Sequence, residues 1–295
     1  RRDAGKPPVL LVIAPTGRRV ESLMPALSAL LPEAAVLPFP AWETLPHERL
    51  SPSPETVGRR LETLARIASS SGPAPVIIVA SVRAALQPLA AGLADVEPVR
   101  LRAGERGHDL GVIVERLVEL AYHRVDMVSR RGEFAVRGGI LDVFPTVADH
   151  PYRIEFFGDE VDQIRTFSVA DQRSLPGAVD HVELLPGREL LLTADVRSRA
   201  RQLAGEFAGL QGMLEKMAEG IPAEGMESLT PALVPHMASL IDYLPEQSAV
   251  ALVDPERCRT RARTLAETNH EFLEAAWRAA TAGASTPVDL AGGDF

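Results

Sequence analysis

Three short runs of consecutive apolar residues stand out in this chain, at Val9–Ile13, Val76–Ala80 and Ala249–Val253. An unbroken apolar run is typical of a β-strand that is buried on both faces of a parallel sheet. Helical spacing follows the first run over Val20–Leu31, and Ser53-Pro54 offers an N-cap and a first-turn proline for a helix before the second run. Strands and helices alternate in this way in open α/β folds. The pattern therefore predicts an α/β domain with an open parallel sheet.

The segment from Tyr122 to Phe167 has a different pattern, because apolar and polar residues alternate in it. Alternation with a period of two predicts strands with one buried face and one open face. Gly138-Gly139 predicts a bulge or sharp bend, and Gly158-Asp159 predicts a tight hairpin turn. The result is a small antiparallel sheet. Its outer face would carry three charged side chains, Arg137, Arg153 and Glu155.

The remaining segments suggest that this small sheet is inserted into the α/β domain. We expect a Pro-rich connection at Val36–Pro40, a crossover at Leu101–Glu105, a helix from Asp109 to Tyr122 and one long helix over Ala194–Glu219. The predicted domains are residues 1–103 and 191–295, as two halves of the α/β domain, with residues 104–190 inserted between them.

Composition limits the classes of function. The chain has 295 residues, 46% of them hydrophobic, which suffices for two or three domains. Its net charge is −9 and its arginines are scattered among acidic residues, so no basic field favours nucleic acid. The single cysteine, Cys258, excludes an internal disulfide and fits a reducing cytoplasm. No stretch approaches the ~20 apolar residues of a membrane span. We therefore expect a cytoplasmic protein.

Candidate catalytic chemistry is sparse. A phosphate-binding loop requires G-x-x-x-x-G-K-[ST], and no such run occurs. Gly5-Lys6 is followed by Pro7, and Thr16-Gly17 lacks the lysine. The seven histidines are isolated, without the spacing of a metal site. We expect no catalytic residue, no metal and no cofactor.

Several motifs in one order carry a family resemblance. They are Tyr122–Asp126, Arg131–Phe134, Val136–Gly138, Asp142–Pro145 and Arg153–Glu160, with Val76–Val82 and Asp242–Pro245 in the flanks. They resemble the UvrA-binding domain of the repair protein UvrB and, more closely, the matching domain in the N-terminal, UvrB-like region of transcription-repair coupling factors (Mfd). The resemblance covers most of the chain. It implies a degenerate P-loop, UvrB-like open parallel sheet domain, split in sequence by a small, mostly antiparallel domain that binds UvrA.

The resemblance also implies a site and partners. The UvrA-contacting positions of the family fall on Arg124, Arg137, Arg153 and Glu155. This sequence departs from UvrB at Ala135, where UvrB carries an arginine. The implied partner is UvrA. In the full-length protein, its own C-terminal domain would cover the UvrA-facing surface, and other domains would contact RNA polymerase and DNA.

The second nucleotide motif of UvrB is altered here. An Asp-Glu-Ala-His-like run follows the acidic strand in UvrB, whereas this chain has Asp254-Pro255-Glu256-Arg257. Proline displaces the key glutamate, so Asp254 and Glu256 are left as an inactive remnant. Asp254 is better explained as a helix N-cap before a first-turn proline. The P-loop segment of the family would lie before Arg1.

Three hypotheses about function follow. The first is a non-catalytic module of a transcription-repair coupling factor that recruits UvrA to stalled RNA polymerase. The others are a UvrB-type DNA-dependent ATPase or helicase domain, and a DNA-binding module that uses the same arginine face. The charges could also be ordinary solvated side chains, because exposed ion pairs contribute little. The first hypothesis predicts that Arg137→Ala or Arg153→Ala weakens UvrA binding without changing the thermal transition.

Overall fold

The computed structural model describes residues 9–44, 50–69 and 74–281, with side chains described except at Ala208 and from Asn269 onward. The chain divides into two compact units. The first contains Arg1–Pro52, Thr63–Asp95 and Ala194–Phe295, and the second contains Ser53–Glu62 and Val96–Thr193. Helix α2 (Pro54–Ser69) contributes its first residues to the second unit and its last residues to the first.

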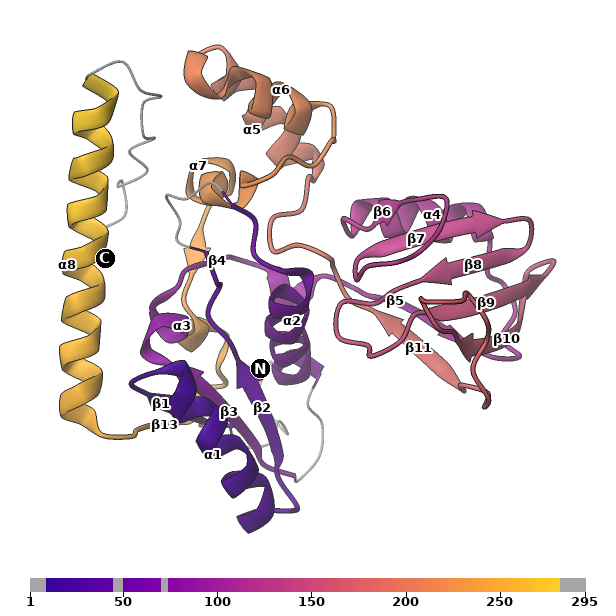
Figure 1. Cartoon of the computed structure of the whole chain (residues 1–295), viewed down its shortest axis with the longest axis horizontal. Helices are drawn as coiled ribbons and strands as arrows, with labels where there is room; N and C mark the ends of the chain where they lie inside the picture. Colours follow the sequence, from indigo (N-terminus) through magenta and orange to yellow (C-terminus); the bar gives the residue numbers. More distant parts are fainter. Residues whose placement is uncertain (1–8, 45–49, 70–73, 282–295) are drawn as a thin grey trace. The chain divides into compact units, whose positions relative to one another are not determined.

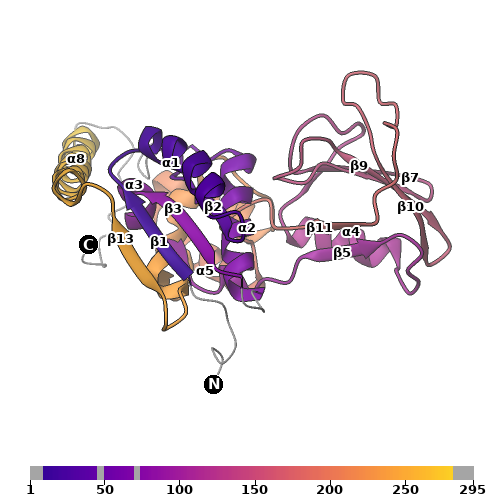
Figure 2. The ribbon, with the colours of Figure 1, turned by 90° about the horizontal axis from the view of Figure 1, so that it is seen from below.

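A four-stranded parallel sheet, sheet A, forms the centre of the first unit, with strand order β13-β1-β3-β2 (Figures 1 and 2). The strands are β1 (Val9–Ala14), β2 (Ala35–Phe39), β3 (Val76–Ser81) and β13 (Ala249–Leu252). Every residue of β3 is buried, as its unbroken apolar run predicts. Helix α1 (Gly17–Leu30) covers one face of the sheet, where Val20 packs in a cluster with Val12 and Val79. The prediction of a mixed α/β fold with a parallel sheet is confirmed.

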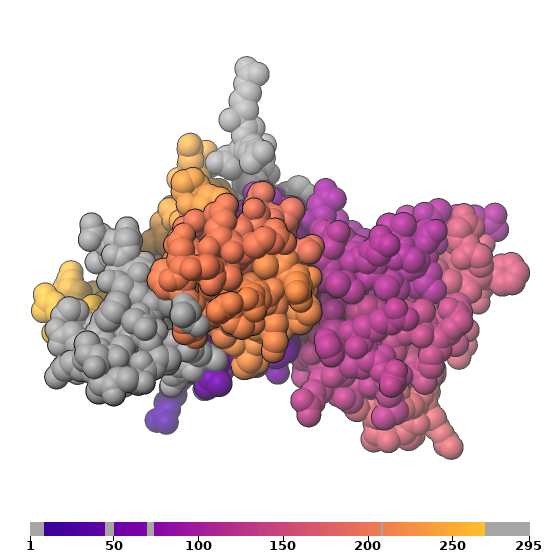
Figure 3. Space-filling model, turned by 90° about the horizontal axis from the view of Figure 1, so that it is seen from above, coloured from indigo at the N-terminus to yellow at the C-terminus, as the bar shows by residue number. Residues whose placement is uncertain are grey.

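The other elements of the first unit are short, apart from the last helix. They are α3 (Val82–Leu86), β4 (Leu89–Ala90), η2 (Leu93–Asp95), α5 (Ala194–Ala204), η3 (Ala208–Leu210), α6 (Gln211–Ala218), η4 (Met226–Leu229), α7 (Thr230–Leu233), β12 (Met237–Ala238), η5 (Leu240–Tyr243) and α8 (Pro255–Thr281). Strands β4 and β12 form a separate antiparallel pair. In the space-filling view the atoms of α5, α6 and α7 form one continuous mass in orange shades (Figure 3). Across the described ranges, no helix combines the length and the apolar character needed to cross a membrane.

The expected connection at Val36–Pro40 is wrong, because β2 occupies most of it. Pro38 lies within this strand and aligns with Val79 of β3. Proline has no N–H to donate to a neighbouring strand, so it is tolerated mainly in edge strands. Strand β2 is an edge of sheet A. The opposite edge, β13, is also less buried than its apolar run suggests, since Val250 and Leu252 are exposed.

The expected long helix over Ala194–Glu219 is also wrong. The chain leaves helix α5 at Gly205 and forms a second helix, α6. Arg197 and Arg201 of α5 each donate a hydrogen bond to the carbonyl of Ala218 at the end of α6, at 3.2 Å. In one straight helix, Arg197 and Ala218 would lie about 30 Å apart, since each residue advances the axis by about 1.5 Å. The segment folds back because this buries the apolar faces of both helices.

The second unit is built on a five-stranded sheet, sheet D, with order β10-β9-β8-β7-β6. Its strands are β6 (His123–Arg124), β7 (Glu133–Arg137), β8 (Ile140–Val143), β9 (Tyr152–Phe157) and β10 (Glu160–Thr166). Neighbours are antiparallel except β6 and β7, which are parallel. The tight hairpin turn predicted at Gly158-Asp159 is confirmed. Gly138-Gly139, predicted as a bulge or sharp bend, is a second two-residue hairpin loop. Gly138 and Gly158 have φ values of 60° and 64°, a conformation that glycine adopts without strain.

The inner face of sheet D packs against helix α4 (Leu110–Glu119) and a two-stranded antiparallel sheet of β5 (Val99–Arg102) and β11 (His181–Leu184). The shared core includes Leu101, Leu117, Phe134 and Ile154. The expected crossover at Leu101–Glu105 is therefore wrong in its first residues, which belong to β5. The N-cap at Asp109 is confirmed, because its carboxylate accepts the N–H of Gly111 at 2.7 Å. Helix α4 ends at Glu119, earlier than predicted.

Candidate protein-interaction site

The outer face of sheet D collects charged side chains from neighbouring strands. In the strand register Ala135 lies opposite Asp142, Asp142 opposite Arg153, and Arg153 opposite Arg165. In an adjacent row Arg137 lies opposite Ile140, and Ile140 opposite Glu155. Because side chains alternate between the two faces of a strand, these residues all project away from the inner core. We call the surface formed by Ala135, Arg137, Asp142, Arg153 and Glu155 the outer face.

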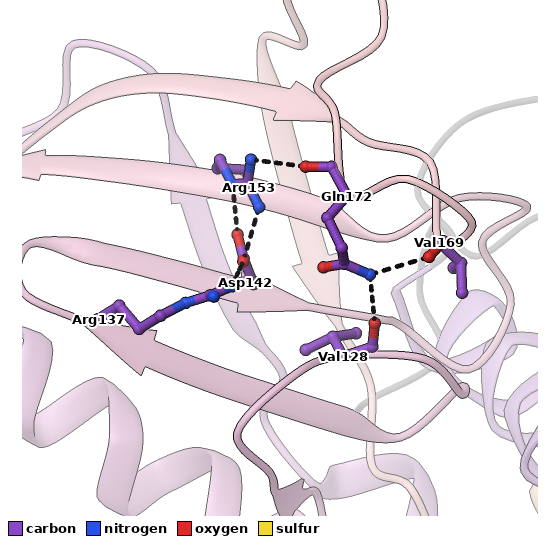
Figure 4. A network of polar contacts seen from close by, with 6 residues as sticks. All are labelled: Val128, Arg137, Asp142, Arg153, Val169 and Gln172. Atoms are coloured by element: carbon purple, nitrogen blue, oxygen red, sulfur yellow. Dashed lines mark hydrogen bonds and ion pairs between the residues drawn. The ribbon is translucent and has the colours of Figure 1, made fainter.

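A buried carboxylate joins the two predicted arginines of the outer face (Figure 4). Asp142 is only 1% exposed. Its Oδ2 accepts Nη2 of Arg137 at 2.8 Å and Nη2 of Arg153 at 2.9 Å, and its Oδ1 accepts Nε of Arg153 at 2.7 Å. A guanidinium that bonds a carboxylate through two nitrogens is held in both position and plane. Arg153 is therefore fixed by a bidentate pair and Arg137 by a single bond.

The loop after β10 completes the surroundings of Arg153. Nη1 of Arg153 donates to the carbonyl of Gln172 at 3.2 Å, and its guanidinium lies 4.7 Å from the centre of the Phe167 ring. The Gln172 amide in turn donates to the carbonyls of Val128 and Val169, which ties two loops together beside the sheet (Figure 4). The hydrogen bonds to Asp142 raise the pKa of Arg153 above its already high usual value. Arg153 is thus a permanent, well-ordered cation.

Exposure separates the two arginines. The side chain of Arg153 is 18% exposed, whereas that of Arg137 is 55% exposed. All three guanidinium nitrogens of Arg153 are engaged, while Arg137 uses Nη2 alone among the hydrogen bonds formed by described residues. Arg137 therefore retains donors for a partner.

The structure places the other predicted residues as follows. Glu155 is half-buried on β9, near Arg153, and forms no hydrogen bond or ion pair within the described ranges. Arg124 is exposed on the edge strand β6, where it aligns with Phe134 of β7. The strands thus bring Arg137, Arg153 and Glu155 onto one face, and Arg124 lies at the edge of the same sheet. That these four residues bind UvrA remains a prediction.

Ala135 has a structural role at the position where the sequence departs from UvrB. Its side chain is buried in a small apolar cluster with Val128, Phe144 and Phe167. A longer side chain at this position would have to displace that cluster. The family resemblance marked Ala135 only as a departure from UvrB, whereas the fold uses it for packing.

The sequence interpretation missed Asp142. The residue stands as a single carboxylate in the apolar run Ile140–Phe144. A buried carboxylate is costly unless it is paired. An acid in such a run, between two strands that each carry an arginine, is the signal from which the network could have been predicted.

Asp254 and Glu256 lie at the start of α8 and do not form a comparable site. Asp254 has a φ of 57°, its carbonyl accepts the N–H of Cys258 at 3.0 Å, and its carboxylate lies 3.6 Å from Arg257. Glu256 pairs with Arg259 on the same helix. The helix begins at Pro255 as predicted, but the Asp254 carboxylate makes no capping bond to the described residues. Among the residues that the structure describes, no three histidine, cysteine or acidic side chains are grouped to hold a metal ion.

Comparison with known proteins identifies the family. The family model of the UvrB interaction domain matches residues 99–190, which contain all strands of sheet D and its inner-face partners β5 and β11. The chain is 48% identical, over 95% of its length, to the transcription-repair-coupling factor of Mycobacterium tuberculosis. The chain belongs to the transcription-repair-coupling factor family.

Other members of the family give the same result at lower identity. The chain is 30% identical to the transcription-repair-coupling factor of Bacillus subtilis over 84% of its length, and 32% identical to that of Escherichia coli over 64%. It spans about a quarter of the mycobacterial relative, 24%, and 22% and 16% of the other two. The outer face lies within the part that matches the UvrB interaction domain.

Proposed function

We propose that this chain is a cytoplasmic, non-catalytic interaction module of a transcription-repair-coupling factor. It binds UvrA through the outer face of sheet D, and so recruits nucleotide excision repair to stalled RNA polymerase. The observation that carries the proposal is the Arg137–Asp142–Arg153 network within the part of the chain that matches the UvrB interaction domain. Binding of RNA polymerase and DNA belongs to other domains of the full-length protein, and its C-terminal domain covers this surface until it is released.

The chemistry of the face suits a protein partner. Guanidinium groups form directional bonds to carboxylates and backbone carbonyls, and arginines are frequent among residues that dominate binding energy. Arg137 offers free donors, and Phe157, which is 81% exposed at the β9–β10 turn, offers apolar area beside them on the same face of β9. Together they provide a directional polar contact and an apolar surface that a partner could bury.

Arg137→Ala tests the proposal. Asp142 keeps its bidentate pair with Arg153 in this variant, so its buried charge stays compensated. Binding of purified UvrA, measured by titration calorimetry, should weaken by about 2 kcal/mol, or about 30-fold. The thermal transition should move little.

Arg102→Ala is the matched control. Arg102 is 60% exposed, belongs to the same unit and donates to Asp180 at 2.7 Å, but it lies on β5 and not on the outer face. Its loss should leave UvrA binding unchanged. Equal binding by the wild-type chain and Arg137→Ala would contradict the proposed contact, and no binding by either would contradict the proposed function.

The DNA-binding hypothesis uses the same arginines as the UvrA-binding proposal, so binding to DNA has to be tested separately, at a low salt concentration that favours it. Phosphate contacts weaken steeply with salt because counterions are released. Arg137 and Arg153 are already bonded to a carboxylate, and the chain carries a net charge of −9. We expect no gel shift of duplex DNA at low salt under conditions in which UvrA binds.

A further inference from the structure

Burial of the Asp142 carboxylate is unfavourable for folding. Its carboxylate is almost fully buried, and a buried charge is unfavourable unless it is paired and hydrogen-bonded. The adjacent position in the register, Ala135, shows that this row of sheet D can be filled by an apolar side chain. Replacing a buried ion pair by apolar residues often stabilises a protein. Packing alone therefore gives no reason for a carboxylate at Asp142.

We propose that Asp142 is a positioning residue for partner binding, which holds Arg137 in the conformation that meets UvrA. This inference rests on the proposed function. We call Asp142 and Arg153 the clamp. Arg153 fixes the Asp142 carboxylate in one orientation through two hydrogen bonds, and the remaining bond of Oδ2 then fixes Nη2 of Arg137.

The contacts of the two arginines divide their roles. Arg153 has every guanidinium nitrogen bonded and stacks on Phe167, so its position is set from within the chain. Arg137 lies at the end of β7, next to the Gly138-Gly139 turn, where a long side chain would otherwise sample many rotamers. Order that exists before binding removes part of the entropy cost of binding. Asp142 supplies this order.

The clamp predicts a specific coupling. In Asp142→Asn the shape of the side chain is kept, but one oxygen acceptor and the charge are lost. UvrA binding should weaken about ten-fold, the effect expected for freeing one or two long side chains at an interface. In the Arg137→Ala background, the same substitution should weaken binding by less than about three-fold, because the residue that Asp142 positions is absent.

Two further variants keep the test decisive. Glu189→Gln alters another buried carboxylate of the same unit, which pairs with Arg60 and lies outside the strands of the outer face, so it should lower stability without changing UvrA affinity. If Asp142→Asn does not fold, as judged by circular dichroism, the charge-balanced variant Asp142→Asn, Arg153→Gln replaces it in the same cycle with Arg137→Ala. Removing both charges of the pair leaves no uncompensated buried charge from this pair, which is the main cost of breaking a buried ion pair.

The outcomes are distinct. Loss of affinity that depends on Arg137 supports the clamp. Wild-type affinity in Asp142→Asn, or an equal loss with and without Arg137, overturns it and leaves the proposed function in place. Failure of the wild-type chain to bind UvrA overturns the proposed function and the clamp together.

Discussion

The outer face of sheet D and the start of α8 contain the same kinds of side chain, yet they differ in what holds those side chains. On the outer face, Asp142 is buried and receives arginines from two neighbouring strands. At the start of α8, Asp254 and Glu256 pair with Arg257 and Arg259, each three residues further along the chain, and all four side chains are largely exposed. Local pairs of this kind contribute a few tenths of a kcal/mol. Residue type and distance are therefore poor guides to a site, and burial with non-local pairing is the better one.

The largest effect should come from Arg153→Ala. This variant leaves Asp142 buried with only the half-exposed Arg137 as a partner, and it removes the stacking on Phe167. An under-compensated buried charge costs about 2–3 kcal/mol of unfolding free energy. Chemical denaturation measures it. This changes the expectation of the first hypothesis, in which the thermal transition stayed in place for both arginines.

The comparison of Arg153→Ala with Arg137→Ala checks this point. Both variants should weaken UvrA binding, but only Arg153→Ala should shift the denaturation midpoint strongly. Equal midpoints for the two variants would mean that Asp142 does not depend on Arg153 for its compensation.

A smaller effect is expected for Arg124→Ala. The Arg124 side chain is exposed on an edge strand and forms no hydrogen bond or ion pair with the described residues, so none of them orders it before binding. Its removal should weaken UvrA binding by about two- to five-fold, as for contacts outside an energetic centre. Stability should not change. A loss as large as that of Arg137→Ala would show that preorganisation is not what distinguishes the two residues.

The smallest effect is expected at Asp254, at the start of α8. The φ of 57° is a conformation that glycine adopts freely and alanine does not. Asp254→Gly should leave the unfolding free energy within about 0.5 kcal/mol of wild type, and Asp254→Ala should lower it by about 1 kcal/mol. If the carboxylate bound a metal ion or a nucleotide, Asp254→Gly and Asp254→Ala would abolish that binding equally, because both variants lack the carboxylate.

Phosphate release with ATP, magnesium and DNA completes the test of Asp254. Neither the wild-type chain nor the variants should show turnover, in keeping with the proposed non-catalytic role. Turnover by the wild-type chain that Asp254→Gly abolishes would favour the UvrB-type ATPase hypothesis.

Local patterns in the sequence determined much of the fold. Continuous apolar runs predicted β1 and β3. Glycine-containing pairs predicted the hairpin at Gly158-Asp159 and a bulge or sharp bend at Gly138-Gly139, where the second hairpin lies. Alternation in the strands placed Arg137, Arg153 and Glu155 on one face of sheet D. These features depend on neighbours in the chain, which is why the sequence alone specifies them.

Only the tertiary structure decided which residues hold the site together. Pro38 lies in a strand because β2 is an edge, α5 and α6 separate because their apolar faces pack together, and Asp142 becomes a clamp because β7 and β9 flank it. Each outcome depends on pairing between segments that are distant along the chain or on burial created by that pairing. Local periodicity contains no information about such partners. The arginines could therefore be predicted from the sequence, whereas only the fold identified the carboxylate that orders them.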